Sequence, residues 1–156
     1  MSYKSSILLA LVGLLVVAGC SKETTGDDQP KSTWTVDGIT YTEGSTPTSY
    51  SSSDNFFSSD DVKDGDITIQ FAQYPTINTT YPLTDLSDTS TLHPGVCSIV
   101  VGLPPNKLYR SLGNTGPKVY ISEGSNGKLI AEFSNVQIKH TISSDIKTLS
   151  GKLIEK

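Results

Sequence analysis

Apolar and polar residues alternate along most of the chain after residue 32, in short segments separated by Gly, Pro, Ser, Asn and Asp. Alternation with a period of two is typical of β-strands that bury one face, and the 3.6-residue period of a helix is almost absent. About seven to nine such segments, at a spacing of about 8–12 residues, predict an all-β domain over residues 33–156. We expect an antiparallel β-sandwich or small barrel.

The clearest turn lies at Asp37-Gly38, between the alternating segments 33–36 and 39–42. Asp-Gly provides the positive φ angles of a type I′ turn, so these residues predict a β-hairpin. Residues 47–66 are rich in Ser and Asp, and we expect a long loop there, or a loop broken by a short turn at 55–57.

The remaining segments differ in how apolar they are. Residues 66–74 place Ile67, Ile69 and Phe71 on one face, as expected for a half-buried strand, whereas 96–102 is apolar enough for a central strand. Shorter strands are expected at 81–84, 107–111, 118–122 and 148–154.

The segment 128–141 is the longest strand candidate, and its alternation changes phase. Leu129, Ala131 and Phe133 share one parity, whereas Val136 and Ile138 share the other. One extra residue near Ser134-Asn135 would restore the phase, which is what a β-bulge does. We therefore expect Phe133 and Val136 to point to the same face.

The first 20 residues have a different pattern. Lys4 precedes an apolar run of 12 residues, Ile7 to Ala18, and small residues lead from there to Cys20. The run is shorter than the ~20 residues of a spanning helix, and it has the layout of a secretory signal peptide. The segment 17–20 (VAGC) resembles a bacterial lipobox, which implies removal of residues 1–19 and lipidation of the Cys20 thiol.

Residues 20–32 are expected to form a flexible tether, because 21–32 is polar and contains no apolar anchor. Ser21 stands where an aspartate would keep many Gram-negative lipoproteins in the inner membrane. Ser21-Lys22-Glu23, with Asp27-Asp28, resembles the leader of surface-displayed lipoproteins of the Bacteroidetes. The expected location is the cell envelope, with a lipid anchor in the outer membrane. Surface display is a hypothesis that follows from the leader-like segment, and the alternative is that this segment is an ordinary solvated linker.

Charge and cysteine content narrow the class of partner. Without residues 1–19 the chain has 137 residues and 11 basic against 16 acidic side chains, a formal charge of −5. This balance argues against nucleic acid and against binding anionic headgroups through charge. Cys97 lies in an apolar segment, and we expect a buried, inert thiol there, with His93 in a turn.

The acidic segment 60–66 is a weak candidate for calcium, through Asp60, Asp61, Asp64 and Asp66. Aligned to an EF-hand loop from Asp60, its third and twelfth positions are apolar, and a lysine stands in its middle. We therefore favour a solvated turn and expect no metal and no cofactor. The chain contains no G-x-S-x-G, H-E-x-x-H or C-x-x-C motif and no phosphate-binding loop, so no catalytic residue is assigned.

Aromatic side chains offer another route to function. Phe56 and Phe57 lie in a polar segment, and Trp34 lies in the first hairpin; these three are the candidate ligand contacts. The alternatives are packing of the two phenylalanines beneath a loop and a core position for Trp34.

Three motifs together resemble a known group: Trp-x-Val-Asp-Gly-x-x-Tyr at 34–41, GKLIAEF at 127–133 and LSGKLI at 149–154. They are similar to small all-β lipoproteins of the Bacteroidetes that have no assigned function. The resemblance implies a sandwich fold and supplies no catalytic residues. We expect an envelope lipoprotein that contacts the membrane through Cys20 and a protein or glycan through its loops, as a binding or structural module. The alternative is a surface hydrolase or an accessory subunit for glycan capture.

Overall fold

The computed structural model describes residues 30–85, 92–113 and 116–156. They form an antiparallel, all-β domain, as predicted, and none of them lies in a helix. The strands are β1 (Thr33–Val36), β2 (Ile39–Thr42), β3 (Ser49–Ser51), β4 (Phe56–Asp60), β5 (Asp66–Phe71), β6 (Thr79–Pro82), β7 (Cys97–Leu103), β8 (Lys107–Ser111), β9 (Lys118–Glu123), β10 (Leu129–His140) and β11 (Ile146–Ile154).

The predicted signal peptide (1–19), the Cys20 lipidation site and the tether up to residue 29 lie outside the described residues. Within the described part of the chain, no helix has the length and apolarity needed to cross a bilayer.

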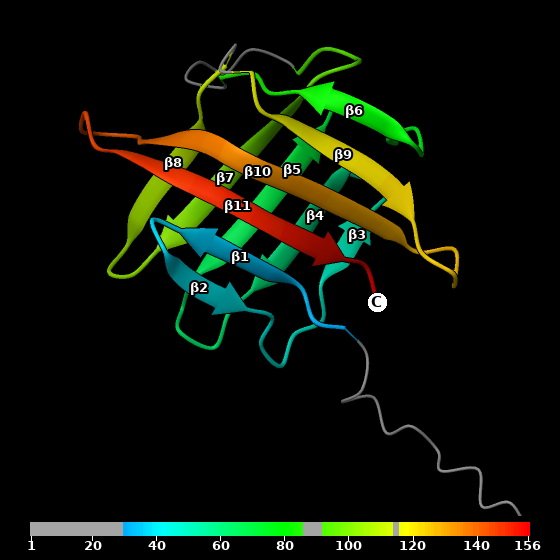
Figure 1. Cartoon of the computed structure of the whole chain (residues 1–156), viewed down its shortest axis with the longest axis horizontal. Coiled ribbons are helices and arrows are strands. Elements are labelled where there is room, and N and C mark those ends of the chain that lie inside the picture. The colour runs from blue at the N-terminus through cyan, green and yellow to red at the C-terminus, as the bar shows by residue number, and fades with distance from the viewer. Residues whose placement is uncertain (1–29, 86–91, 114–115) are drawn as a thin grey trace, which may run out of the picture.

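The sheet curls into a half-barrel because one long strand serves two layers. Nine strands follow one another in the order β2-β1-β11-β10-β8-β7-β5-β4-β3. The first half of β10 pairs with β9, which in turn pairs with β6, and residues 138–140 of β10 pair with β8. Figure 1 shows the two layers: β6, β9, β10, β11, β1 and β2 in front, and β8, β7, β5, β4 and β3 behind.

The core fills the space between the layers. Ile67, Ile69 and Phe71 are buried from β5, as their alternation predicts, and β7 lies centrally between β5 and β8. Cys97 is a free, fully buried thiol, and burial raises its pKa to about 12, which agrees with the predicted inert side chain. His93 is exposed in a loop, also as predicted.

Two local predictions are confirmed by the backbone. Asp37 and Gly38 have φ angles of 47° and 83°, as a type I′ turn requires, and they join β1 to β2. In β10 the register with β11 shifts between Phe133 and Val136, and Asn135 takes a φ of 53°. Both Phe133 and Val136 are buried, so the bulge returns the apolar positions to the core face.

The prediction of a loop over 47–66 is wrong, because this segment contributes β3 and β4 to the sheet. β4 pairs with β3 on one side and with β5 on the other. Its inward positions are Phe57 and Ser59, both buried, so a polar side chain stands where the apolar alternation would continue. Because the buried Ser59 is polar, the alternation of apolar and polar residues does not indicate this strand. A buried hydroxyl also needs hydrogen-bond partners, which other segments of the chain must provide.

Those partners form a buried polar group, here called the Ser32 cluster: Ser32, Glu43, Thr48 and Ser59. Thr48 Oγ1 lies 2.6 Å from Ser32 Oγ, 3.0 Å from Glu43 Oε2 and 2.8 Å from Ser59 Oγ. The backbone N–H of Ser32 donates to Glu43 Oε2 at 3.0 Å, and Ser32 Oγ accepts from the N–H of Ile154 at 2.8 Å. Ser32, the last residue assigned to the tether, is therefore part of the folded domain.

Candidate functional site

Two of the three candidate ligand-contact rings belong to the core. Trp34 is 1% exposed and stacks on Tyr41, with ring centroids 5.8 Å apart. Phe57 is 0% exposed and meets the edge of Tyr50. The expectation that these rings contact a ligand is therefore corrected, because inward strand positions bury them. Phe56 is half-buried on the opposite face of β4, across from Gln70.

The acidic segment forms a turn, and its carboxylates serve the backbone or face water. Asp61 is buried and accepts hydrogen bonds from the N–H groups of Thr42 and Lys63 at 3.2 and 3.1 Å. Asp60 and Asp64 are exposed. Within the described residues, no three His, Cys, Asp or Glu side chains come together in a way that could hold a metal ion.

Asp66 lies on the other side of this turn, against β7. A Cβ added to Gly102 would fall 1.9 Å from Asp66 Oδ1, so the carboxylate lies directly on the Gly102 backbone. Burial raises the pKa of Asp66, and the facing Asp60 raises it further. The four candidate calcium ligands thus have three different environments: Asp61 binds backbone N–H groups, Asp60 and Asp64 are exposed to solvent, and Asp66 packs on β7.

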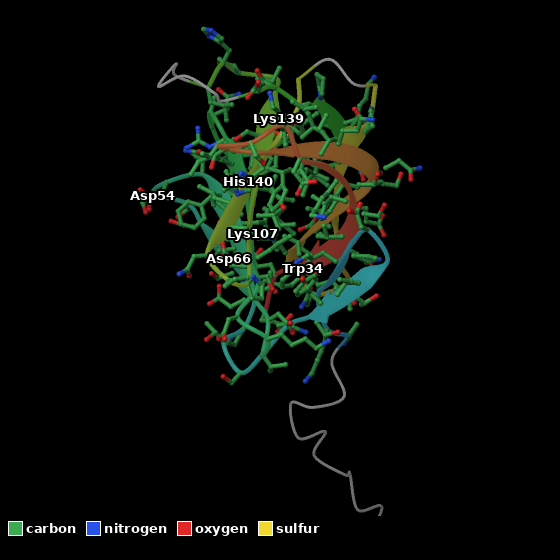
Figure 2. All side chains as sticks on the ribbon, turned by 90° about the vertical axis from the view of Figure 1, so that its left-hand side faces the viewer. Trp34, Asp54, Asp66, Lys107, Lys139 and His140 are labelled. Carbon is green, nitrogen blue, oxygen red and sulfur yellow. The ribbon has the colours of Figure 1, made fainter. Side chains whose placement is uncertain are left out.

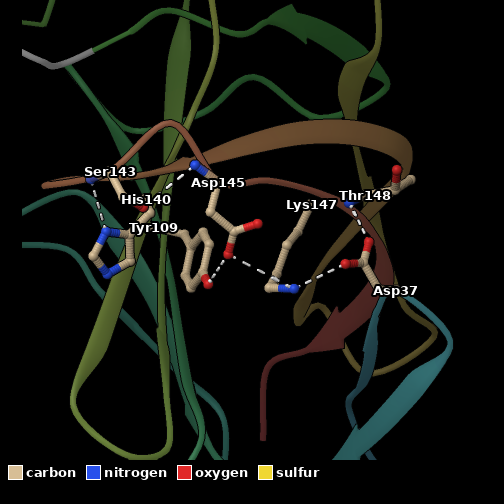
Figure 3. A network of polar contacts seen from close by, with 7 residues as sticks. All are labelled: Asp37, Tyr109, His140, Ser143, Asp145, Lys147 and Thr148. Carbon is tan, nitrogen blue, oxygen red and sulfur yellow. Dashed lines mark hydrogen bonds and ion pairs between the residues drawn. The ribbon is translucent and has the colours of Figure 1, made fainter.

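Three charged side chains and a tyrosine are linked at the end of the β10–β11 hairpin, and we call them the Lys147 network: Asp37, Tyr109, Asp145 and Lys147 (Figure 3). Lys147 Nζ is 3.0 Å from Asp37 Oδ2 and 3.9 Å from Asp145 Oδ2. The Tyr109 hydroxyl donates to Asp145 Oδ2 at 2.7 Å. The Thr148 N–H donates to Asp37 Oδ1 at 2.8 Å, so the network joins the β1–β2 turn to β8 and β11.

His140 fixes the tip of the same hairpin. Its Nδ1 accepts from the N–H groups of Ile142 and Ser143 at 3.2 and 3.1 Å, and its own backbone N–H donates to Asp145 O. This pattern places the ring proton of neutral His140 on Nε2. The imidazole also meets the Tyr109 ring edge to face, 5.2 Å between centroids. The tip is therefore held in one shape, although Ile142 at its end is 90% exposed.

The electrostatics of the network favour fixed charges over proton transfer. The Thr148 N–H and the Lys147 ammonium lower the pKa of Asp37, and the hydrogen bond to Asp37 raises the pKa of Lys147. Burial and the bond to Asp145 raise the pKa of Tyr109. Each shift moves the pKa of the group further from 7, so none of the three groups is suited to general acid–base catalysis at neutral pH.

A shallow pocket of about 140 Å³ adjoins the hairpin and is lined by Asp85, Arg110, Leu112, Lys139, His140 and Thr141. Arg110 and Lys139 face each other in the register of β8 and β10. Figure 2 shows Lys139 and His140 above Trp34 and Asp66, and Figure 1 shows this hairpin on the opposite side of the domain from the C-terminus. This end of the molecule thus presents a rigid, charged surface with an apolar tip.

Sequence reasoning did not find this network. The sequence marks Asp37 only as a turn residue, and Tyr109, Asp145 and Lys147 stand in no motif. Asp37 and Lys147 are 110 residues apart, and only the pairing of β1 with β11 brings them together.

Comparison of the chain with known protein families, with curated proteins and with solved structures finds no match.

Proposed function

We propose that the protein is a lipid-anchored binding or structural module of the cell envelope, similar to the small all-β lipoproteins of the Bacteroidetes. The lipobox-like segment before Cys20 and the polar stretch after it support anchoring in the outer membrane. Two or more acyl chains are needed for lasting attachment, and the lipobox resemblance implies a diacylglycerol with an additional N-acyl chain.

The observation that carries the binding role is the Lys147 network. Its charged groups are held against one another on a rigid sheet, with shifts that keep them in one protonation state. Such a surface recognises a partner without supplying a proton acceptor or a nucleophile. It lies on the opposite side of the domain from the C-terminus (Figure 1), where Lys156 contacts Pro30, so a tether at the N-terminus leaves it accessible to a protein or glycan.

Anchoring is tested by growing expressing cells with radiolabelled fatty acid. The processed polypeptide should carry the label and stay in the membrane fraction, and Cys20→Ala should lose both properties. A mature form that is free of label, or that is released into the medium, would contradict the anchor.

Surface display has its own test. External protease should degrade the protein on intact cells. If it is degraded only after lysis, the protein faces the periplasm, and the display hypothesis fails while the anchor stands.

One observation favours the rival hydrolase. Asp60 and Asp66 face each other across β4 and β5, and the raised pKa of Asp66 is of the kind that a general acid needs. Release of new reducing ends from glycans by the purified chain, abolished by Asp66→Asn, would establish that activity. Equal release by the variant would exclude this pair.

A further inference from the structure

The outer face of the front layer contains a hollow that is separate from the Lys147 network and from the pocket beside it. It has a volume of about 310 Å³ and is lined by Lys118, Tyr120, Glu132, Phe133, Ser134 and Gly151. The lining comes from β9, β10 and β11, three neighbouring strands in the middle of the layer. A hollow on paired strands has a fixed shape, because the backbone ladder sets the spacing of its side chains.

An aromatic side chain stands at the centre of this face. Tyr120 is 37% exposed, and its hydroxyl donates to Asn78 Oδ1 at 3.2 Å. Its strand neighbours across β9 are Glu132 on one side and Thr80 on the other. The hydrogen bond to Asn78 orients the ring, which remains accessible to solvent.

Charged and hydroxyl groups surround the ring. Glu132 accepts from Lys152 Nζ at 2.8 Å, which holds the carboxylate in place, and Lys118 and Ser134 complete the lining. The bulge that shapes this part of β10 is pinned by the Asn135 N–H, which donates to Ser150 Oγ at 2.9 Å. Donors, acceptors and an aromatic surface thus lie within one preorganised hollow.

We propose that this hollow binds a saccharide, with Tyr120 against the apolar face of a sugar ring and Glu132, Lys118 and Ser134 bonded to its hydroxyl groups. A sugar ring combines a C–H face with a rim of hydroxyls, and an aromatic ring beside fixed polar groups is complementary to both. The local charge is close to balanced, which suits an uncharged or singly acidic sugar. A protein partner would instead call for exposed apolar anchors, and the most exposed one described, Ile142, lies at the β10–β11 tip.

This proposal goes beyond the binding role proposed above, because it assigns a second site, separate from the Lys147 network, and names its ligand class. It does not depend on lipid at Cys20, so the two can fail separately. Fatty-acid labelling decides the anchor, and binding of sugars by the purified chain decides the hollow.

The test is calorimetric titration of the detergent-solubilised full chain with defined cello-, xylo-, manno-, N-acetylglucosamine and galacturonic acid oligosaccharides. At least one should bind. Tyr120→Ala should weaken that binding by about tenfold or more, because it removes the ring. Tyr120→Phe keeps the ring and should stay within about threefold of wild type. Glu132→Gln should weaken binding without changing the thermal midpoint appreciably.

Tyr74→Ala is the matched control, because Tyr74 is 55% exposed and does not line the hollow. It should bind as wild type does. Absence of binding to every oligosaccharide at millimolar concentration overturns the proposal. Binding that survives Tyr120→Ala, or that Tyr74→Ala removes, also overturns it, since either result places the sugar elsewhere.

Discussion

The Ser32 cluster and the Lys147 network both join the start of the domain to its last strand, and they differ in how much water they meet. In the Ser32 cluster all four side chains are buried. In the Lys147 network the charged side chains keep between 25% and 47% of their exposure. The hydrogen bonds are of similar length, yet breaking them should have very different costs, because a buried polar atom without a partner is far more costly than an exposed one.

The largest effect is expected at Thr48, whose hydroxyl is the centre of the Ser32 cluster. Thr48→Val keeps the shape and leaves Glu43 and two serines short of a partner, so it should lower the free energy of unfolding by about 2–3 kcal/mol. Thr48→Ser retains the hydroxyl and should lose less than about 1 kcal/mol. Urea unfolding measures both. Equal losses would mean that the hydroxyl contributes no more than the methyl group, which would contradict this prediction.

The next effect appears on acidification. Burial acts to raise the pKa of Glu43, but hydrogen bonds from Ser32 and Thr48 outweigh it, and the pKa lies below its ordinary value of 4.5. A carboxyl with a lowered folded pKa stabilises the fold above its unfolded pKa, and this contribution is lost as the pH falls through the folded pKa. Stability should therefore decline below about pH 4.5. Glu43→Gln should flatten that decline in unfolding experiments at stepped pH, and an unchanged slope would contradict it.

A smaller loss is expected for Lys147→Met. Exposed ion pairs contribute about 0.2–1 kcal/mol each, and salt screens them. The variant should lose about 1 kcal/mol at low salt, and the difference from wild type should shrink in 1 M NaCl. The Thr48→Val loss should not change with salt. Lys152→Met, which removes the exposed pair with Glu132, serves as the matched control for deleting a single surface lysine.

The smallest effect has the opposite sign. The pKa of Asp66 is raised, so its ionised form is disfavoured in the folded state, and stability is lost as the pH rises through that folded pKa. Asp66→Asn removes the charge and should raise stability at pH 7 by about 0.5 kcal/mol or less. The gain should vanish below the ordinary pKa of 3.8, where Asp66 is protonated in both states. A destabilised variant at pH 7 would contradict this.

The predictable parts of this fold are those specified locally. Asp37-Gly38 determines its own turn, the alternation of Ile67, Ile69 and Phe71 marks a buried face, and the phase change around Ser134 locates the bulge. β4 was not predicted because its inward-facing residue Ser59 is polar and interrupts the apolar alternation. A serine is tolerated at this buried position because the Thr48 hydroxyl forms a hydrogen bond with it. That contact depends on tertiary structure, which a periodicity argument does not contain.

The candidate site was less accessible to prediction for the same reason. Trp34 and Phe57 are candidate ligand contacts in the sequence because they are aromatic residues among polar ones, but both lie at inward-facing strand positions and are buried. Tyr120 and Glu132 form one side of a hollow through cross-strand pairing, and nothing in their sequence neighbourhoods singles them out. Residue type can suggest a chemistry, but which residues share a surface depends on the register of strands that are distant in sequence.

The position of Ser32 has a mechanical consequence. β1 follows directly from Ser32 and runs toward the β10–β11 hairpin end, in register with β11 and β2 (Figure 1). A pull applied at Pro30 against a partner held at the hairpin end therefore acts along the length of β1. The hydrogen bonds that join β1 to β11 and β2 are then loaded in shear and resist the force together. If the strand were pulled away sideways, they would break one after another. Tension between the N-terminal end of the domain and its β10–β11 end would therefore be resisted by all the hydrogen bonds of β1 together.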